Sequence, residues 1–171
     1  MVAAEDQIAI IAEIDDALRA AGISWWLFGG WGMDAHVGRI TRAHHDIEFW
    51  VGMDDAEPVR AALHGRGFAA VGVQPPEESQ EYERDGVRFS AAYFVRADDG
   101  SAHPEGRWSD WRFPPGSFGD ATGAIGGRKA PVMSVAGMLA MKSQYSTLCN
   151  GRPVRDKDVS DMRVLRDLAA R

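Results

Sequence analysis

The stretch from Phe28 to Val51 limits the possible folds of this chain more than any other part of it. It opens with the pair Gly29-Gly30, which follows an apolar run and precedes a predicted short helix over residues 31–37. Paired glycines let a backbone take positive φ and approach a ligand closely, and a helix beginning beside them aims free N–H groups at an anion. The sequence therefore predicts a phosphate-binding turn between a buried strand and a short helix.

Two carboxylates follow on the next predicted strand. Asp46 and Glu48 stand two residues apart in an apolar run over residues 46–51, so both side chains are expected on one face of the strand. Carboxylates at this spacing can hold Mg²⁺, which takes oxygen ligands and bridges to substrate phosphates. A phosphate-binding turn beside an acidic pair is the apparatus of metal-dependent phosphoryl or nucleotidyl transfer.

Basic residues lie between the glycine turn and the acidic pair. Arg42 can bind triphosphate oxygens because its guanidinium forms two parallel hydrogen bonds with a phosphate; an ion pair with Asp34 or Asp46 is the alternative. Asp34 itself is expected to support the turn. His44 has no second His/Cys cluster at metal-binding spacing near it, so a zinc site is not expected.

Together these residues resemble a known pattern. A glycine pair followed by Asp46-x-Glu48 is similar to the nucleotidyltransferase superfamily, the DNA polymerase β-like proteins. The longer motif that contains these residues resembles the small antibiotic nucleotidyltransferases, which modify lincosamides and aminoglycosides. It comprises Gly29-Gly30-Trp31-Gly32-x-Asp34, Gly38-Arg39 and Arg42-x-His44-x-Asp46-Ile47-Glu48. The close match covers residues 25–51, and a looser one extends through Asp98-Asp99-Gly100 to Arg155-x-Lys157-Asp158-x-x-Asp161.

The resemblance implies an α/β fold of the nucleotidyltransferase type. It consists of a small, mixed, twisted sheet flanked by helices, with a C-terminal helical pair closing a cleft over Asp46 and Glu48. We expect the α/β domain to span residues 1–132 and the helical segment packed on it to span residues 133–171.

The resemblance also implies a reaction, the Mg²⁺-dependent transfer of an adenylyl group from ATP, or of a nucleotidyl group from another nucleoside triphosphate. The acceptor is a hydroxyl of an antibiotic-like small molecule. Asp46 and Glu48 would hold the metal. The residues expected to bind the nucleotide are Gly29, Gly30, Arg42, His44 and Lys142.

One position departs from the family pattern. The family has a third carboxylate on a later strand, where it completes the metal site and can take the hydroxyl proton, and this position falls at Ser90 here. A serine hydroxyl ligates Mg²⁺ weakly and cannot act as a base at pH 7. Glu83 and Asp85 are the candidate catalytic replacements. The alternatives are slow transfer, or a repurposed fold that performs nucleotide-independent acid–base chemistry on a small metabolite or only binds a ligand.

Length, composition and charge limit the number of domains, the class of ligand and the expected compartment. At 171 residues the chain suits one domain, and 45% hydrophobic residues argue against disorder. A net charge of −6 and an isoelectric point near 5.3 argue against nucleic-acid binding and suit a cationic acceptor, although ordinary solubility explains them equally well. The lone Cys149 excludes an intramolecular disulfide, and neither a signal peptide nor a membrane span is evident, so we expect a cytoplasmic protein.

The rest of the chain predicts further elements. A strand pair is expected over residues 80–84 and 87–96, because Asp85-Gly86 favours a hairpin turn, and helices are expected over residues 5–21, 135–148 and 155–170. Residues 101–127 are rich in Gly, Pro and Trp and predict an irregular binding loop. Three aromatic residues of this loop can stack on a ligand or cover the sheet, namely Trp108, Trp111 and Phe113.

Overall fold

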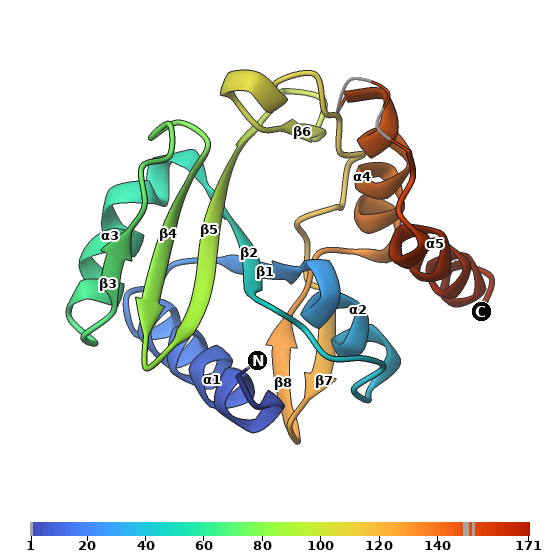
Figure 1. The fold of residues 1–171 in the computed structure, drawn as a ribbon. Coiled ribbons are helices and arrows are strands. Elements are labelled where there is room, and N and C mark those ends of the chain that lie inside the picture. Colours follow the sequence, from blue (N-terminus) through green and yellow to red (C-terminus); the bar gives the residue numbers. More distant parts are fainter. Residues whose placement is uncertain (1, 149–150, 152) are drawn as a thin grey trace.

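The fold is built around a mixed six-stranded sheet, seen in a computed structural model that describes residues 2–148, 151 and 153–171 (Figure 1). The strands run in the order β1-β2-β5-β4-β3, with β6 beside β5. Only β2 and β5 pair in parallel, and the other neighbours are antiparallel. The strands are β1 (Trp25–Phe28), β2 (Ile47–Gly52), β3 (Ala69–Val71), β4 (Ser79–Arg84), β5 (Val87–Arg96) and β6 (Ala102–His103).

Two groups of helices cover the two faces of this sheet (Figure 1). Ile47, Phe49 and Val51 of β2 point into a core shared with the first and third helices. Trp50 points the opposite way, into a second core that includes Leu165 of the last helix. The alternation follows from the two-residue period of a strand. The helices are α1 (Ala4–Ala20), α2 (Gly29–Val37), α3 (Ala56–His64), α4 (Val135–Leu148) and α5 (Asp156–Ala169).

Most predicted elements are present, with shifted ends. The hairpin turns at Asp85 and Gly86, both with positive φ (53° and 78°), as the sequence predicted. The second strand begins at Ile47, so Asp46 directly precedes it, and α2 begins at Gly29 rather than at residue 31. The strand is therefore one residue shorter than predicted at its start, and the helix is two residues longer because it includes both glycines.

The prediction for residues 101–127 is wrong at its C-terminal end. A second hairpin forms there from β7 (Thr122–Ile125) and β8 (Arg128–Pro131), and it packs against α2 and β1. Gly126 and Gly127 turn it, with φ of 55° and 76°. The glycine pair was the available signal, but the strands it joins are only four residues long and weakly patterned.

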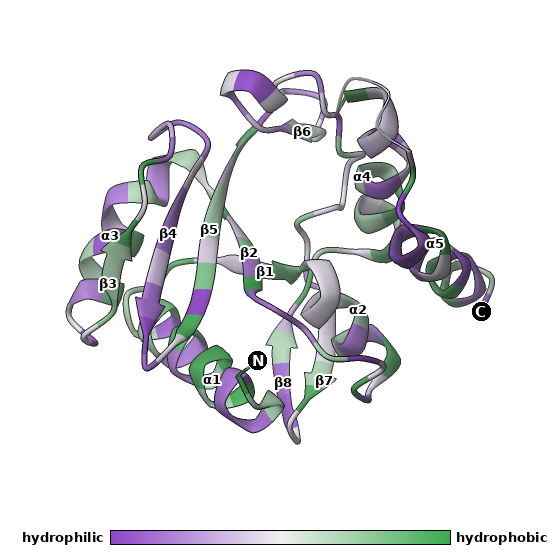
Figure 2. Ribbon diagram, in the orientation of Figure 1, coloured by the Kyte–Doolittle hydropathy of each residue, from purple (hydrophilic) through white to green (hydrophobic). Residues whose placement is uncertain are grey.

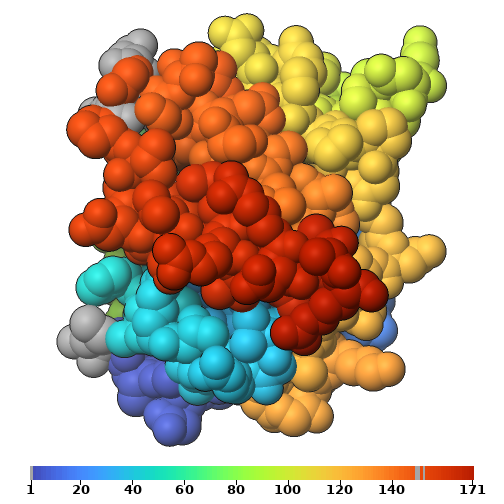
Figure 3. All heavy atoms as spheres, turned by 90° about the vertical axis from the view of Figure 1, so that its right-hand side faces the viewer, coloured from blue at the N-terminus to red at the C-terminus, as the bar shows by residue number. Residues whose placement is uncertain are grey.

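The C-terminal helices close the structure over the second face. In the view of Figure 3, α5 (dark red) lies across the molecule beside the segment that follows α2 (cyan), and Arg42 of that segment pairs with Asp161 of α5. None of the described helices is both long and apolar enough to cross a membrane. Cys149, the lone cysteine that excludes an intramolecular disulfide, lies outside the described residues.

Candidate active site

The glycine pair lies at the first turn of α2, where the backbone approaches two functional side chains. Gly29 has a φ of 64°, and a Cβ added to it would collide with Oε2 of Glu48. A Cβ added to Gly30 would collide with Nδ1 of the His44 ring. Both positions therefore require glycine. Since no side chain caps the start of α2, its first N–H groups remain available to an anion.

A cavity of about 430 Å³ opens beside this turn. Its walls come from the α2 turn and β2, from the loop before β7, and from both C-terminal helices. The lining residues are Phe28, Gly29, Gly30, Arg42, Asp46, Glu48, Trp108, Trp111, Met141, Lys142, Tyr145, Arg155, Lys157 and Asp158. A second cavity of about 460 Å³ lies beside α1 and β8, but it holds neither the glycine turn nor the acidic pair.

Asp46 and Glu48 both line the first cavity, as the strand spacing predicted. Asp46 is exposed, whereas Glu48 is half-buried. Burial, helped by the neighbouring Asp46, raises the pKa of Glu48 to about 7, while Lys157 and Lys142 act in the opposite direction. The nearby lysines thus do not offset the burial of Glu48, and a carboxyl group with this pKa is only partly ionised at neutral pH.

The cations of the cavity differ in how far they are already neutralised. Lys142 lies 3.0 Å from Asp158 and 2.8 Å from Asp161, and it is nearly buried. Arg155 pairs with Asp158 as well, which raises the pKa of Arg155 and lowers that of Asp158. Lys157, in contrast, lines the cavity without an ion pair to any described residue. Lys142 was the lysine that the sequence analysis expected to bind the nucleotide, and its two acidic partners on α5 are not evident from local spacing.

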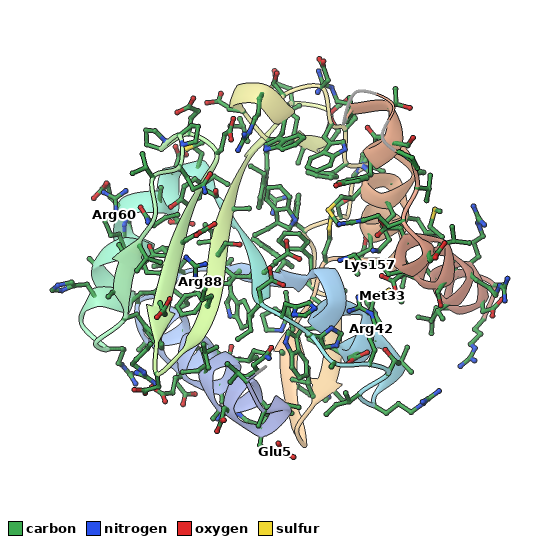
Figure 4. All side chains as sticks on the ribbon, viewed as in Figure 1. Glu5, Met33, Arg42, Arg60, Arg88 and Lys157 are labelled. Carbon is green, nitrogen blue, oxygen red and sulfur yellow. The ribbon has the colours of Figure 1, made fainter. Side chains whose placement is uncertain are left out.

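A buried chain of hydrogen bonds stands behind the glycine turn (Figure 4 labels Arg42). The His44 Nε2 atom lies 2.6 Å from Oδ2 of Asp34, and its Nδ1 atom lies 3.0 Å from Nη1 of Arg42. Because a guanidinium can only donate, Nδ1 must accept and Nε2–H must donate to Asp34. Thr41 also donates to Asp34. The chain fixes Arg42 at the cavity wall.

The expected roles of two residues of this chain need refinement. Asp34 supports the turn, as predicted, since it is buried and bound by both Thr41 and His44. His44 was expected to bind the nucleotide, but it is buried behind Gly30 and is absent from the cavity wall. Its contact with a ligand would run through Arg42, whose own partners are His44 and Asp161 rather than Asp34 or Asp46.

Ser90 occupies the place on β5 next to the acidic pair. The strand register sets it directly beside Glu48. The two candidates for the missing carboxylate, Glu83 and Asp85, do not line the cavity. Glu83 pairs with the exposed Arg88 at 3.3 Å, and Asp85 is 87% exposed in the hairpin turn.

The three aromatic residues of the loop have different positions: two line the cavity, and the third covers the sheet. Trp108 and Trp111 line the cavity and stack on each other, with centroids 5.1 Å apart and planes inclined by 16°. Phe113 is fully buried in the core beneath them, in edge contact with Trp50 and Phe118. The tryptophans can therefore face a ligand, while the phenylalanine covers the sheet.

The same glycine turn, acidic pair and C-terminal helices fall within one family profile. Residues 10–165 match the profile of the aminoglycoside-2''-adenylyltransferases. The chain belongs to this family. A curated 2''-aminoglycoside nucleotidyltransferase from Klebsiella pneumoniae is 40% identical over 42 residues, which are 25% of this chain and 24% of that protein. The chain thus aligns with only about a quarter of the length of the curated relatives it matches.

Solved structures extend the likeness to the whole fold. The crystal structure of ANT(2'')-Ia in complex with adenylyl-2''-tobramycin has a TM-score of 0.75 at 20% identity, over 96% of this chain and 94% of that one. The lincosamide adenylyltransferase LnuA, bound to lincomycin, has a TM-score of 0.69 at 21% identity, over 98% of each chain. This family member therefore has the fold that the motif implied.

Proposed function

We propose that this family member transfers the adenylyl group of ATP, with Mg²⁺, to a hydroxyl group of an antibiotic-like small molecule. The observation that carries the proposal is the shared cavity: Glu48 and Asp46 lie opposite the cations of α4 and α5, with the start of α2 between them. Carboxylates that hold a metal, and cations and N–H groups that meet phosphates, are the parts that adenylyl transfer requires.

The acidic pair fits Mg²⁺. Glu48 and Asp46 offer carboxylate oxygens, and the charge of Asp46 helps to raise the pKa of Glu48. Among the described residues no cluster of three or more His, Cys, Asp or Glu could hold an ion, so the protein would supply two ligands. Mg²⁺ commonly takes one or two carboxylates and completes its shell with water and substrate phosphates. When bound, it would neutralise charge on the reacting phosphate.

The remaining roles belong to residues of the chain itself. The start of α2 and the unpaired Lys157 would bind the triphosphate, and Arg42, which lies beside Gly30 and pairs with α5, would orient it. Trp108 and Trp111 would exclude water and stack on the base or the acceptor. In the reaction the acceptor oxygen bonds to the α-phosphorus, the bond to the bridging oxygen breaks, and pyrophosphate leaves with its electrons.

Mass spectrometry tests the proposal directly. The purified chain is incubated with ATP, Mg²⁺ and a panel of aminoglycosides and lincosamides, and the expected product is an acceptor with one adenylyl group added. Isothermal calorimetry with Mg²⁺-ATP should show binding that disappears when Asp46 is changed to Asn. Absence of ATP binding at millimolar concentration would overturn the proposal and favour nucleotide-independent chemistry in the cavity.

A further inference from the structure

We infer that Glu81 of β4 is the proton acceptor for the attacking hydroxyl group, in the role left open by Ser90. The inference rests on the proposed function and assigns one of its steps to a residue outside the main cavity wall. It starts from the strand register. Glu48 of β2 is paired with Ser90 of β5, and Ser90 is paired in turn with Glu81 of β4.

Residues paired across neighbouring strands share one face of the sheet. Glu48, Ser90 and Glu81 therefore form a row across three strands, on the face turned away from α1 and α3. Strands lie about 4.8 Å apart, so the backbones of the two glutamates are separated by roughly 10 Å. Both glutamate side chains are long, and the serine between them is short; of the three, Glu48 lines the cavity. A carboxylate from β4 can thus approach the place that a residue at position 90 would reach.

The other acids of this region are less suitable. Glu83 lies one row further along the strand, opposite Arg88 instead of Ser90, and Asp85 lies in the turn beyond it. Asp158 and Asp161 line or border the cavity, but Lys142 holds both of them. A proton acceptor needs a free carboxylate within reach of the hydroxyl.

Glu81 is held only loosely and can meet this condition. Its Oε2 atom is 3.5 Å from Nη2 of Arg88, a residue whose side chain is 59% exposed, and its Oε1 atom accepts a long hydrogen bond of 3.3 Å from Gln74. Exposed ion pairs of this kind contribute little to stability, so an arriving acceptor can release them. Figure 2 shows β4 as a largely hydrophilic strand beside the alternating β5, and Figure 4 labels Arg88 on the same part of the sheet.

The step balances without a further reactant. The acceptor O–H bond breaks, its proton goes to the Glu81 carboxylate, and its electron pair forms the bond to the α-phosphorus of ATP. The bond between that phosphorus and the bridging oxygen breaks, and pyrophosphate carries away the electrons. Protonated Glu81 then returns its proton to water.

The test compares E81Q with E83Q, using an acceptor that the wild-type chain adenylylates. Glu83 is the matched control, because it lies on the same strand and face and pairs with the same arginine. We expect E81Q to lower kcat by about 10²-fold or more, the usual loss for a general base, with little change in the KM for ATP. E83Q should remain close to wild type.

A rescue variant separates a chemical role from a structural one. In E81Q, the second change S90D places a carboxylate on the middle strand of the row, and kcat should recover by at least tenfold, or about 1.4 kcal/mol of transition-state stabilisation. Unchanged kcat in E81Q would overturn the assignment and leave the proposed function standing. A loss of kcat that S90D does not relieve, with an equal rise in KM for ATP, would also overturn it. If the wild-type chain adenylylates no acceptor, the proposed function fails, and this assignment fails with it.

Discussion

The two sides of the acidic pair are built differently. Toward α2, α4 and α5, several charged groups have buried partners, as in the chain from Asp34 through His44 to Arg42 and in the pairing of Lys142 with Asp158. Toward β4, the charged groups are exposed and joined by long contacts, such as that between Glu81 and Arg88. Groups whose positions are fixed in advance suit a constant ligand, and adaptable ones suit a variable ligand. Under the proposed function, the nucleotide would bind on this preorganised side and the acceptor on the adaptable side.

The largest expected effect comes from removing a carboxylate from the preorganised side. D46N takes one negative oxygen from the pair that would hold Mg²⁺, and transfer should fall by about 10³-fold or more, as when an equivalent phosphate-stabilising charge is lost. The readout is kcat for adenylylation at saturating acceptor. Asp54, an exposed acid beyond the same strand, supplies the control. Equal rates for D46N and D54N would mean that the acidic pair does not take part.

A second prediction uses the raised pKa of Glu48, about 7 against an ordinary value of 4.5. Without Mg²⁺, the folded protein holds this proton more tightly than the unfolded chain does. The contribution of Glu48 to stability is therefore highest below pH 4.5 and is lost as the pH rises through about 7, by about 3 kcal/mol in all. E48Q should lack this loss, so it should melt above wild type at pH 8 and close to it at pH 5.

Thermal melts in EDTA across pH 5–8 provide the measurement. Parallel melting curves for the two proteins at every pH would contradict the prediction. Addition of Mg²⁺-ATP at pH 8 should reduce the difference, because a bound cation offsets the buried negative charge of wild type and E48Q lacks the ligand.

A third prediction tests the close approach at the glycine turn. In G30A the new methyl group meets the His44 ring and lies 3.2 Å from Nη2 of Arg42. The resulting strain should cost about 1–3 kcal/mol of stability, as overpacking does, and ATP affinity should fall because Arg42 is displaced. Calorimetry with ATP measures the second effect. Gly65 offers a control, since its φ is −61° and an added Cβ makes only ordinary contacts.

Sequence reasoning reached the preorganised side more easily than the adaptable one. The glycine pair and Asp46-x-Glu48 lie close in sequence, so local spacing was enough to bring them together. The pairing of Lys142 with Asp158 and Asp161 depends on two helices packing, and no local pattern reports that. Long-range ion pairs of this kind are fixed by tertiary structure alone.

The pairing of Glu81 with Ser90 can be predicted from the sequence. Counting outward from the two-residue turn at Asp85-Gly86 pairs residue 84 with 87, and three steps later Glu81 with Ser90. The predicted turn at Asp85-Gly86 thus sets the whole register between β4 and β5. The continuation of this row to Glu48 could not be predicted, because it depends on parallel pairing with a strand some forty residues away.

The smallest expected effect concerns the aromatic wall between the two sides. Trp108 lines the cavity and stacks on Trp111, whereas Phe113 of the same loop is buried in the core. W108A should therefore weaken ligand binding by about tenfold, at the lower end of stacking energies for a base on an aromatic side chain, and leave melting nearly unchanged. Separate KM values for ATP and for the acceptor show which ligand contacts the tryptophans. A rise in the KM for ATP alone would mean that the tryptophans belong to the preorganised side. A rise in the KM for the acceptor alone would mean that they belong to the adaptable side. If neither KM changes, Trp108 only covers the cavity.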